Sequence, residues 1–213
     1  MTAWPNPSSE ILETVVWRRH QLPTPELRAR GVTRRFGVYV IAHAWRGRAI
    51  DRALDRYVAD PWTADAAPVT LPDGTRLAGG GGAHVVAYVG HNRWMDHRTP
   101  YRFPPETPDA PVKGAIAMAC LTAPYVGDPL AAGPRVPLLL TRDFVSAGAG
   151  AFEGALLGLA AGADLAAIRR RAAAAYADSE RKTYERVESA FTNPAHARWR
   201  PGASVAAADC VYP

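Results

Sequence analysis

The sequence has little cysteine and no long apolar run. Its two cysteines, Cys120 and Cys210, stand far apart in unrelated contexts, which excludes a disulfide framework and a cysteine-based zinc cluster. No apolar stretch reaches the roughly 18 residues that a membrane span needs. The segment Met1 to Leu12 lacks the basic head and apolar core of a signal peptide. We therefore expect a soluble, cytoplasmic protein that has no membrane partner.

Lysine is also scarce, so the positive charge comes from arginine. The formal net charge is +5 and the pI is about 9.5, a balance that is compatible with an acidic partner. Only Lys113 and Lys182 are lysines, and Arg169 to Arg171 is the only run of three basic residues. The arginines are scattered along the sequence, and no aromatic residues interleave with them as in a stacking groove. We therefore do not expect nucleic acid as a partner.

The chain is long enough for one domain, and its apolar runs predict the elements of that domain. It has 213 residues, of which 48% are hydrophobic and 21% are charged, so it is expected to fold over 1–213 with its core at about 36–191. Short apolar runs separated by long crossings predict an α/β three-layer sandwich with a mostly parallel central sheet. The expected elements are an N-terminal helix at 8–22, buried strands at 36–42, 83–90, 114–120 and 136–141, a hairpin at 68–77, helices at 47–59, 151–161 and 164–191, and an irregular tail at 192–213.

Polar and reactive residues follow the predicted strands at the edge where ligands bind to an open parallel sheet. They are His43, Trp45 and Arg46 after the first strand, Gly90, His91 and Asn92 after the second, Cys120 at the end of the third, and Arg142, Asp143 and Phe144 after the fourth. Neighbouring parallel strands lie about 4.8 Å apart. A histidine and a cysteine that end two consecutive strands are therefore expected to face one another across one crevice.

A thiol beside an imidazole has a definite chemistry. The His91 imidazole can accept the Cys120 proton or favour its thiolate, and it can later protonate a leaving amine. Backbone N–H groups of Cys120 and of Asn92 or a neighbour can stabilise the oxyanion. Gly90 permits a backbone shape at the histidine turn that a side chain would obstruct. This chemistry requires no cofactor and no metal.

Two sequence segments carry a resemblance to a known group of enzymes. They are HVVAYVGHN (84–92) and KGAIAMACLT (113–122). An apolar strand that ends in Gly-His, followed by a strand that ends in Ala-Cys, resembles the caspase, legumain and gingipain clan (clan CD) of cysteine peptidases. The segments VYVIAHAWRGRAI (38–50) and VPLLLTRDF (136–144) resemble the clan's first strand and helix and the strand after the nucleophile. The residues YVGHN (88–92), WMD (94–96) and LLLT (138–141) are also similar to those of a group of uncharacterised bacterial proteins related to that clan.

The resemblance covers roughly residues 36 to 190, as short segments, and it implies a function. Carried over to this chain, it makes His91 the general acid/base and Cys120 the nucleophile of a cysteine peptidase that acts on a peptide or protein. It identifies no activating partner. The clan usually has glycine directly after the histidine, where this chain has Asn92. Loops after the first and fourth strands commonly wall the substrate pocket, where Arg142 favours an acidic side chain and Asp143 favours a basic one.

Other interpretations of these residues stay open. A cysteine in an apolar run is often a buried hydrophobic residue, so a caspase-like interaction or scaffold module without catalytic activity is one alternative. A second is a nucleotide-binding α/β protein that uses the turn with Gly148 and Gly150 before a helix. His43 is more simply explained by a local hydrogen bond. Asp96 can orient His91, but pairing of this carboxylate with a nearby arginine is the simpler expectation.

Overall fold

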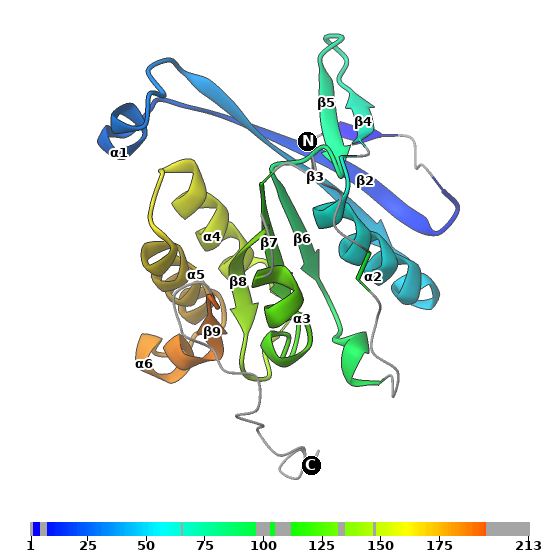
Figure 1. Cartoon of the computed structure of the whole chain (residues 1–213), viewed down its shortest axis with the longest axis vertical. Coiled ribbons are helices and arrows are strands. Elements are labelled where there is room, and N and C mark those ends of the chain that lie inside the picture. The colour runs from blue at the N-terminus through cyan, green and yellow to red at the C-terminus, as the bar shows by residue number, and fades with distance from the viewer. Residues whose placement is uncertain are drawn as a thin grey trace.

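The computed structural model describes residues 2–4, 8–64, 66–96, 103–104, 112–131, 135–146 and 148–194 (Figure 1). Its strands are β1 (Thr2–Trp4), β2 (Ile11–Gln21), β3 (Phe36–Trp45), β4 (Ala66–Thr70), β5 (Arg76–Gly80), β6 (Val85–Val89), β7 (Lys113–Met118), β8 (Arg135–Thr141) and β9 (Phe191–Thr192). Its helices are α1 (Pro25–Ala29), α2 (Ile50–Ala59), α3 (Ala123–Ala131), α4 (Gly150–Ala160), α5 (Leu165–Ser179) and α6 (Tyr184–Val187), with short 3-10 turns η1 (Gly47–Ala49), η2 (Asp60–Trp62), η3 (Arg93–Met95) and η4 (Glu188–Ala190).

The central sheet has the order β6-β7-β8-β9. Strands β6, β7 and β8 run parallel, and β9 pairs with β8 in the antiparallel direction. The predicted strands at 83–90, 114–120 and 136–141 are therefore confirmed as the parallel part of a mixed α/β structure. Strand β7 is the most deeply buried of them, because its Ala115, Ile116, Ala117 and Met118 are almost fully enclosed. A continuous apolar run is typical of a strand that is covered on both faces.

Helices cover both faces of this sheet, and alternate residues of β7 divide between the two sides. Ala115 and Ala117 lie in the cluster formed with α2 and α3, whereas Ile116 and Met118 lie in the cluster formed with α4 and α5. The predicted helices at 47–59 and 151–161 are confirmed to within a few residues. In α5, the Asp164 carboxylate accepts the Ala167 N–H at 2.7 Å and begins the helix.

The predicted N-terminal helix at 8–22 is wrong, because this segment forms the strand β2. Ser8 is an acceptable helix cap, and the apolar residues fall at helical spacing, but the segment is rich in β-branched side chains. Thr14, Val15 and Val16 are consecutive and buried, which suits a pleated strand better than one face of a helix. Pairing with β3 over nearly the whole strand decides the outcome.

The position of the predicted first strand is also wrong. Strand β3 is not part of the parallel sheet but pairs antiparallel with β2, for example through Val16 and Ile41, in a separate sheet of order β1-β2-β3. Most of its residues are only partly buried. An apolar run shows that a segment is strand-forming, but it does not show which strand lies beside it. The β4–β5 hairpin, predicted from Pro72, Asp73 and Gly74, is confirmed as a third sheet.

The long β2–β3 ribbon projects beyond the central sheet and rests on the α4–α5 turn (Figure 1). The Gln21 side chain donates to the Ala160 carbonyl at 2.7 Å, and the Thr24 hydroxyl donates to the Ala161 carbonyl at 2.7 Å. These bonds fix helix α1, which lies at the tip of the ribbon, against the helical layer.

The C-terminal part differs from the expected single helix at 164–191. Helix α5 ends at Ser179, and Arg181 adopts the left-handed conformation with φ 53°. This turn lets Thr192 pair with Leu140 of β8, so residues 192 and 193 are buried rather than part of an irregular tail. The predicted tail at 195–213, with Cys210, lies outside the described residues. No helix in the described ranges is both long enough and apolar enough to cross a bilayer.

Candidate active site

The histidine turn follows β6 and is fixed by the core beneath it. The Gly90 N–H continues the ladder by donating to the Met118 carbonyl at 3.0 Å, and the Tyr88 hydroxyl donates to the His91 carbonyl at 2.8 Å. Trp94 is buried and packs edge-on against Tyr88, with ring centroids 5.6 Å apart. These contacts hold the backbone on both sides of His91 and leave its side chain 60% exposed.

Gly90 has a different role from the expected one. Its backbone is not among the left-handed glycines. A Cβ placed there would lie 3.1 Å from the Tyr88 hydroxyl oxygen. The absence of a side chain thus gives space to the hydroxyl that holds His91.

Asn92 joins the histidine turn to the cysteine turn. Its side chain is fully buried, and its Nδ2 donates to the carbonyls of Cys120 and Leu121, the latter at 3.3 Å. Its Oδ1 has no hydrogen-bond donor among the residues that the structure describes. The sequence predicted that the Asn92 backbone N–H contributes to oxyanion stabilisation. It did not indicate this side-chain link, because the two carbonyls belong to residues about 30 positions further along the chain than Asn92.

The cysteine turn between β7 and α3 has a strained backbone. Leu121 has φ 52°, in the region that residues with a side chain seldom adopt. Its N–H donates to the Asp143 carbonyl at 3.1 Å. Directly after it, the buried hydroxyls of Thr122 and Thr141 lie 2.9 Å apart, and each accepts the backbone N–H of the other residue. The neighbouring strand β8 therefore imposes the conformation of this turn.

Cys120 and His91 occupy equivalent places at the ends of neighbouring strands. Val89 of β6 is paired with Met118 of β7, and each reactive residue comes two positions later. Their side chains have different contacts, since the His91 ring is bonded to Asp96, which Arg93 joins to Asp51 of α2, whereas Cys120 lies next to Val145 of the α4–α5 cluster. The Cys120 side chain is partly exposed, and its thiol donates to the Val145 carbonyl at 3.5 Å. No hydrogen bond joins this thiol to the His91 ring in the described part of the chain.

A chain of charged groups fixes the His91 ring. Its Nε2 lies 2.8 Å from Asp96 Oδ2, and Arg93 Nη1 lies 3.2 Å from the same oxygen. Arg93 Nε donates in turn to Asp51 Oδ1 of α2 at 3.0 Å. The hydrogen bond from His91, followed by that from Arg93, lowers the pKa of Asp96. Asp96 thus pairs with both the histidine and an arginine, although the sequence presented these pairings as alternatives.

Two backbone donors at the turns are available for a ligand. Among the described residues, the N–H groups of Cys120 and Asn92 have no acceptor, whereas those of Leu121 and Arg93 donate to backbone carbonyls. The N–H groups that the sequence proposed for the oxyanion are therefore unoccupied.

The loop after β8 lies beside the cysteine turn, as expected for a parallel neighbour. Arg142, Asp143 and Phe144 are all exposed, and the bond from Leu121 N–H to the Asp143 carbonyl attaches this loop to the cysteine turn. Phe144 is 43% exposed. The three residues thus lie beside the cysteine turn, and their role as a substrate wall stays a prediction.

The predicted substrate residues after the first strand belong elsewhere, because β3 is not in the central sheet. The His43 ring is hydrogen-bonded to the Thr14 hydroxyl at 2.9 Å, and burial followed by the nearby charge of Arg56 lowers its pKa. Trp45 packs against the core cluster of α2, and Arg46 Nε donates to the Ser9 carbonyl at 2.9 Å. These contacts agree with the simpler explanation of His43 as a locally bonded side chain.

The glycines at the start of α4 are explained by close helix packing. A Cβ at Gly150 would lie 2.4 Å from the Ser179 hydroxyl oxygen, and one at Gly154 would lie 2.5 Å from the Arg171 carbonyl oxygen. A Cβ at Gly148 would lie 3.0 Å from a Glu180 carboxylate oxygen. An anionic ligand at this turn would meet that carboxylate, so these glycines give no support to a phosphate site.

Within the described ranges, no three His, Cys, Asp or Glu side chains are grouped so that they could hold a metal ion. Comparisons of the chain with protein-family models, with curated proteins and with solved structures give no match.

Proposed function

We propose that the chain is a cysteine peptidase of caspase-like, three-layer architecture in which Cys120 is the nucleophile and His91 the general acid/base. The observation that carries the proposal is the link between the two turns, in which the buried Asn92 side chain bonds to the Cys120 and Leu121 carbonyls. Buried hydrogen bonds of this kind rigidify a structure, and together with the strained turn at Leu121 they hold the histidine and cysteine turns in one relative position.

The chemistry follows from the groups at these turns. The His91 imidazole takes the proton of the Cys120 thiol, and the thiolate attacks the carbonyl carbon of the scissile peptide bond. The resulting oxyanion accepts hydrogen bonds from the N–H groups of Cys120 and Asn92. Collapse breaks the C–N bond, and the leaving amine takes a proton from the His91 imidazolium. Water activated by His91 then hydrolyses the thioester and restores the thiol.

Asp96 is a positioning residue in this proposal. Its bond to His91 Nε2 leaves Nδ1 as the nitrogen that exchanges protons with Cys120. The bonds from Arg93 to Asp96 and Asp51 attach this carboxylate to α2. Because the group is exposed to solvent, we expect Asp96→Ala to lower kcat by about tenfold, or about 1.4 kcal/mol, with KM unchanged.

The matched control for Asp96→Ala is Asp128→Ala, since Asp128 is an exposed carboxylate on α3. The variant Asp96→Asn keeps an acceptor for His91 and should recover part of kcat. If Asp96→Ala and Asp128→Ala show the same kcat, Asp96 does not position the histidine.

The peptidase proposal is tested by cleavage of a peptide library. Wild-type protein should cleave it, and both Cys120→Ala and His91→Ala should abolish cleavage. The matched controls are Cys210→Ala and His84→Ala, of which His84 is an exposed histidine at the opposite end of β6. The cleaved sequences also show whether Arg142 or Asp143 selects the substrate, since the first favours acidic and the second basic side chains. Absence of cleavage, or cleavage that survives Cys120→Ala, contradicts the proposal.

The competing function is a caspase-like interaction module without catalysis. The observation that favours it is the hydrogen bond from the Cys120 thiol to the Val145 carbonyl, rather than to the imidazole. In such a module, iodoacetamide leaves Cys120 of the folded protein unlabelled, and Cys120→Ala has no effect on partner binding.

A further inference from the structure

The positive charge of the chain is concentrated at the distal part of the β2–β3 ribbon. Residues 17–35, here called the basic arm, contain six arginines and a single carboxylate, Glu26. Their formal charge of +5 equals that of the whole chain, so the rest of the chain is formally neutral. The arginines are scattered in the sequence, but the antiparallel return of the ribbon brings them together. They are Arg18, Arg19, Arg28, Arg30, Arg34 and Arg35.

These guanidinium groups are exposed, and they are largely uncompensated. All six residues are exposed. Among the described residues, only Arg18 lies within ion-pair distance of a carboxylate, at 3.4 Å from Asp73, and both of those side chains are about half exposed. Hydrogen bonds from its own backbone N–H and from Thr24 lower the pKa of Glu26, the single carboxylate of the arm, and the charges of Arg30 and of Arg171 in α5 add smaller contributions. The arm thus presents positive charge that is only partly compensated within the protein.

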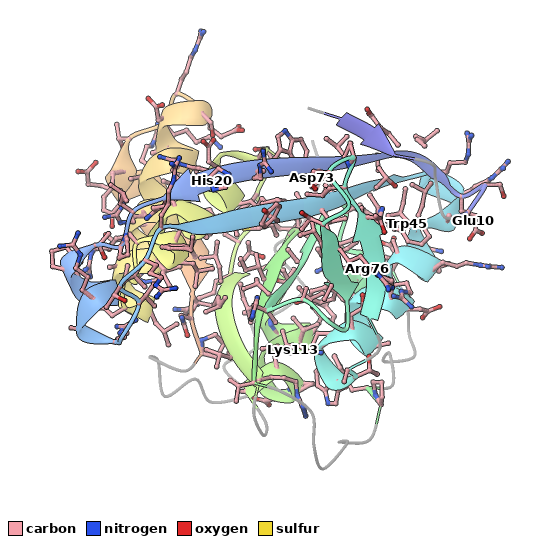
Figure 2. All side chains as sticks on the ribbon, turned by 90° about the horizontal axis from the view of Figure 1, so that it is seen from above. Glu10, His20, Trp45, Asp73, Arg76 and Lys113 are labelled. Carbon is pink, nitrogen blue, oxygen red and sulfur yellow. The ribbon has the colours of Figure 1, made fainter. Side chains whose placement is uncertain are left out.

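One side of the arm is held against the α4–α5 turn. Its inner side rests on the α4–α5 turn through the Gln21 and Thr24 bonds, and a Cβ at Gly162 would lie 2.8 Å from the Leu27 side chain. Figure 2 shows His20 on the ribbon beside the helical layer and far from Trp45 at the other end. Strand β2 has 11 residues, which at a rise of about 3.4 Å per residue makes the ribbon more than about 30 Å long.

We propose that the basic arm is a docking surface for double-stranded DNA. Arg18 and Arg19 lie on the end of strand β2, and Arg28 lies in helix α1. The major groove of B-form DNA admits strand ribbons and helices, whereas the deep and narrow major groove of A-form RNA does not. Arginine is the side chain whose planar guanidinium matches phosphate oxygens best. The arm has only two exposed large apolar side chains, Trp17 and Leu22, so its chemistry suits phosphate contacts rather than insertion into a lipid surface. Cys120 plays no part in this surface.

The test uses the full chain and a fluorescein-labelled DNA duplex of about 24 base pairs, with fluorescence anisotropy measured between about 50 and 200 mM salt. The arm variant replaces Arg19, Arg28, Arg34 and Arg35 with glutamine. The matched control replaces four exposed arginines elsewhere, Arg48, Arg52, Arg76 and Arg186, with glutamine. Both variants lose the same net charge, and circular dichroism checks that both are folded.

Wild-type protein should bind the duplex with a dissociation constant in the micromolar range at low salt. The logarithm of the association constant should fall linearly with the logarithm of the salt concentration. In the arm variant this slope should be less steep by up to about 0.9 for each lost phosphate contact, that is by about 3 to 4 in total. Affinity should fall at least about tenfold in the arm variant and about twofold or less in the control.

Three results overturn the proposal. The first is no binding of the DNA duplex at low salt, and the second is equal weakening by the two variants. The third is preference for another polyanion: tighter binding of an RNA duplex of the same length, or sedimentation with phosphatidylcholine and phosphatidylglycerol vesicles without binding of the duplex. Because the DNA assay does not involve the thiol, Cys120→Ala should bind as wild type does, and failure here leaves the peptidase proposal standing.

Discussion

Replacement of Asn92 by aspartate exchanges the side-chain amide group for an oxygen at the link between the histidine and cysteine turns. The side chain keeps its shape, but a carboxylate oxygen replaces the Nδ2 that donates to the Cys120 and Leu121 carbonyls. The site is fully buried, and Oδ1 already lacks a partner. In Asn92→Asp, an unpaired charge would therefore face two carbonyl oxygens without any compensating donor.

The expected cost follows from this geometry. An uncompensated buried charge costs about 3 to 5 kcal/mol, and in a chain of this size each kcal/mol lowers Tm by about 2 to 4 °C. We therefore expect Tm to fall by roughly 6 to 20 °C at pH 7. Protonation of the new carboxyl removes the charge and restores one donor. The folded protein therefore favours the protonated form, and the pKa of the introduced aspartate rises above the value of about 3.9 in the unfolded chain.

The sign of the pH dependence distinguishes this cause from a general loss of packing. The destabilisation should be small below about pH 4 and should grow as the pH rises through the unfolded-state and then the folded-state pKa. Thermal unfolding followed by circular dichroism at several pH values measures it. Ser189→Asp, at an exposed position, is the control for an added surface charge. Stability equal to that of wild type at pH 7, or a loss that does not change with pH, refutes the role given to the Asn92 amide.

Urea unfolding tests three further predictions. Gly154→Ala should lower the free energy of unfolding by about 1 to 3 kcal/mol, because its Cβ would lie 2.5 Å from the Arg171 carbonyl oxygen. The control Gly47→Ala places its Cβ in open space and should have little effect. Equal effects of the two substitutions would contradict the packing explanation. Because burial lowers the pKa of His43, stability should fall as the pH drops below about 6.5, and His43→Gln should remove that part of the pH dependence. Thr141→Val should cost about 2 kcal/mol by leaving the Thr122 N–H without its acceptor; an unchanged midpoint contradicts this.

The parallel sheet could be predicted because its strands carry their own signal. Each of β6, β7 and β8 is a short apolar run. Burial on both faces makes the runs of β7 and β8 nearly continuous, whereas β6 is buried on one face and exposes Ala87 and Val89 on the other. The place of His91 and Cys120 at the strand ends followed from the same runs. The partner of β3 could not be predicted, because the residues of a strand indicate burial but do not identify the neighbouring strand. The error in β2 had the same origin, since Val15 and Val16 fit a helical spacing until β3 lies beside them.

The connections within the site were the least predictable part. The Asn92 side chain meets carbonyls of another turn, and the pairing of Thr122 with Thr141 depends on the register between β7 and β8. Every residue has a backbone carbonyl, so the sequence does not indicate which carbonyls accept these hydrogen bonds. Likewise, the arginines of the basic arm are separated in the sequence and meet only because the ribbon reverses its direction.

The proximity of the Cys120 thiol and the His91 imidazole is tested most directly by the rate of alkylation. The peptidase proposal predicts that iodoacetamide labels Cys120 of the folded protein, because in that proposal the His91 imidazole takes the proton of the thiol. Peptide mapping by mass spectrometry distinguishes this label from one on Cys210. The rate should fall at least about tenfold in His91→Ala and stay unchanged in His84→Ala. Equal rates in wild type and His91→Ala would show that the two groups do not act together.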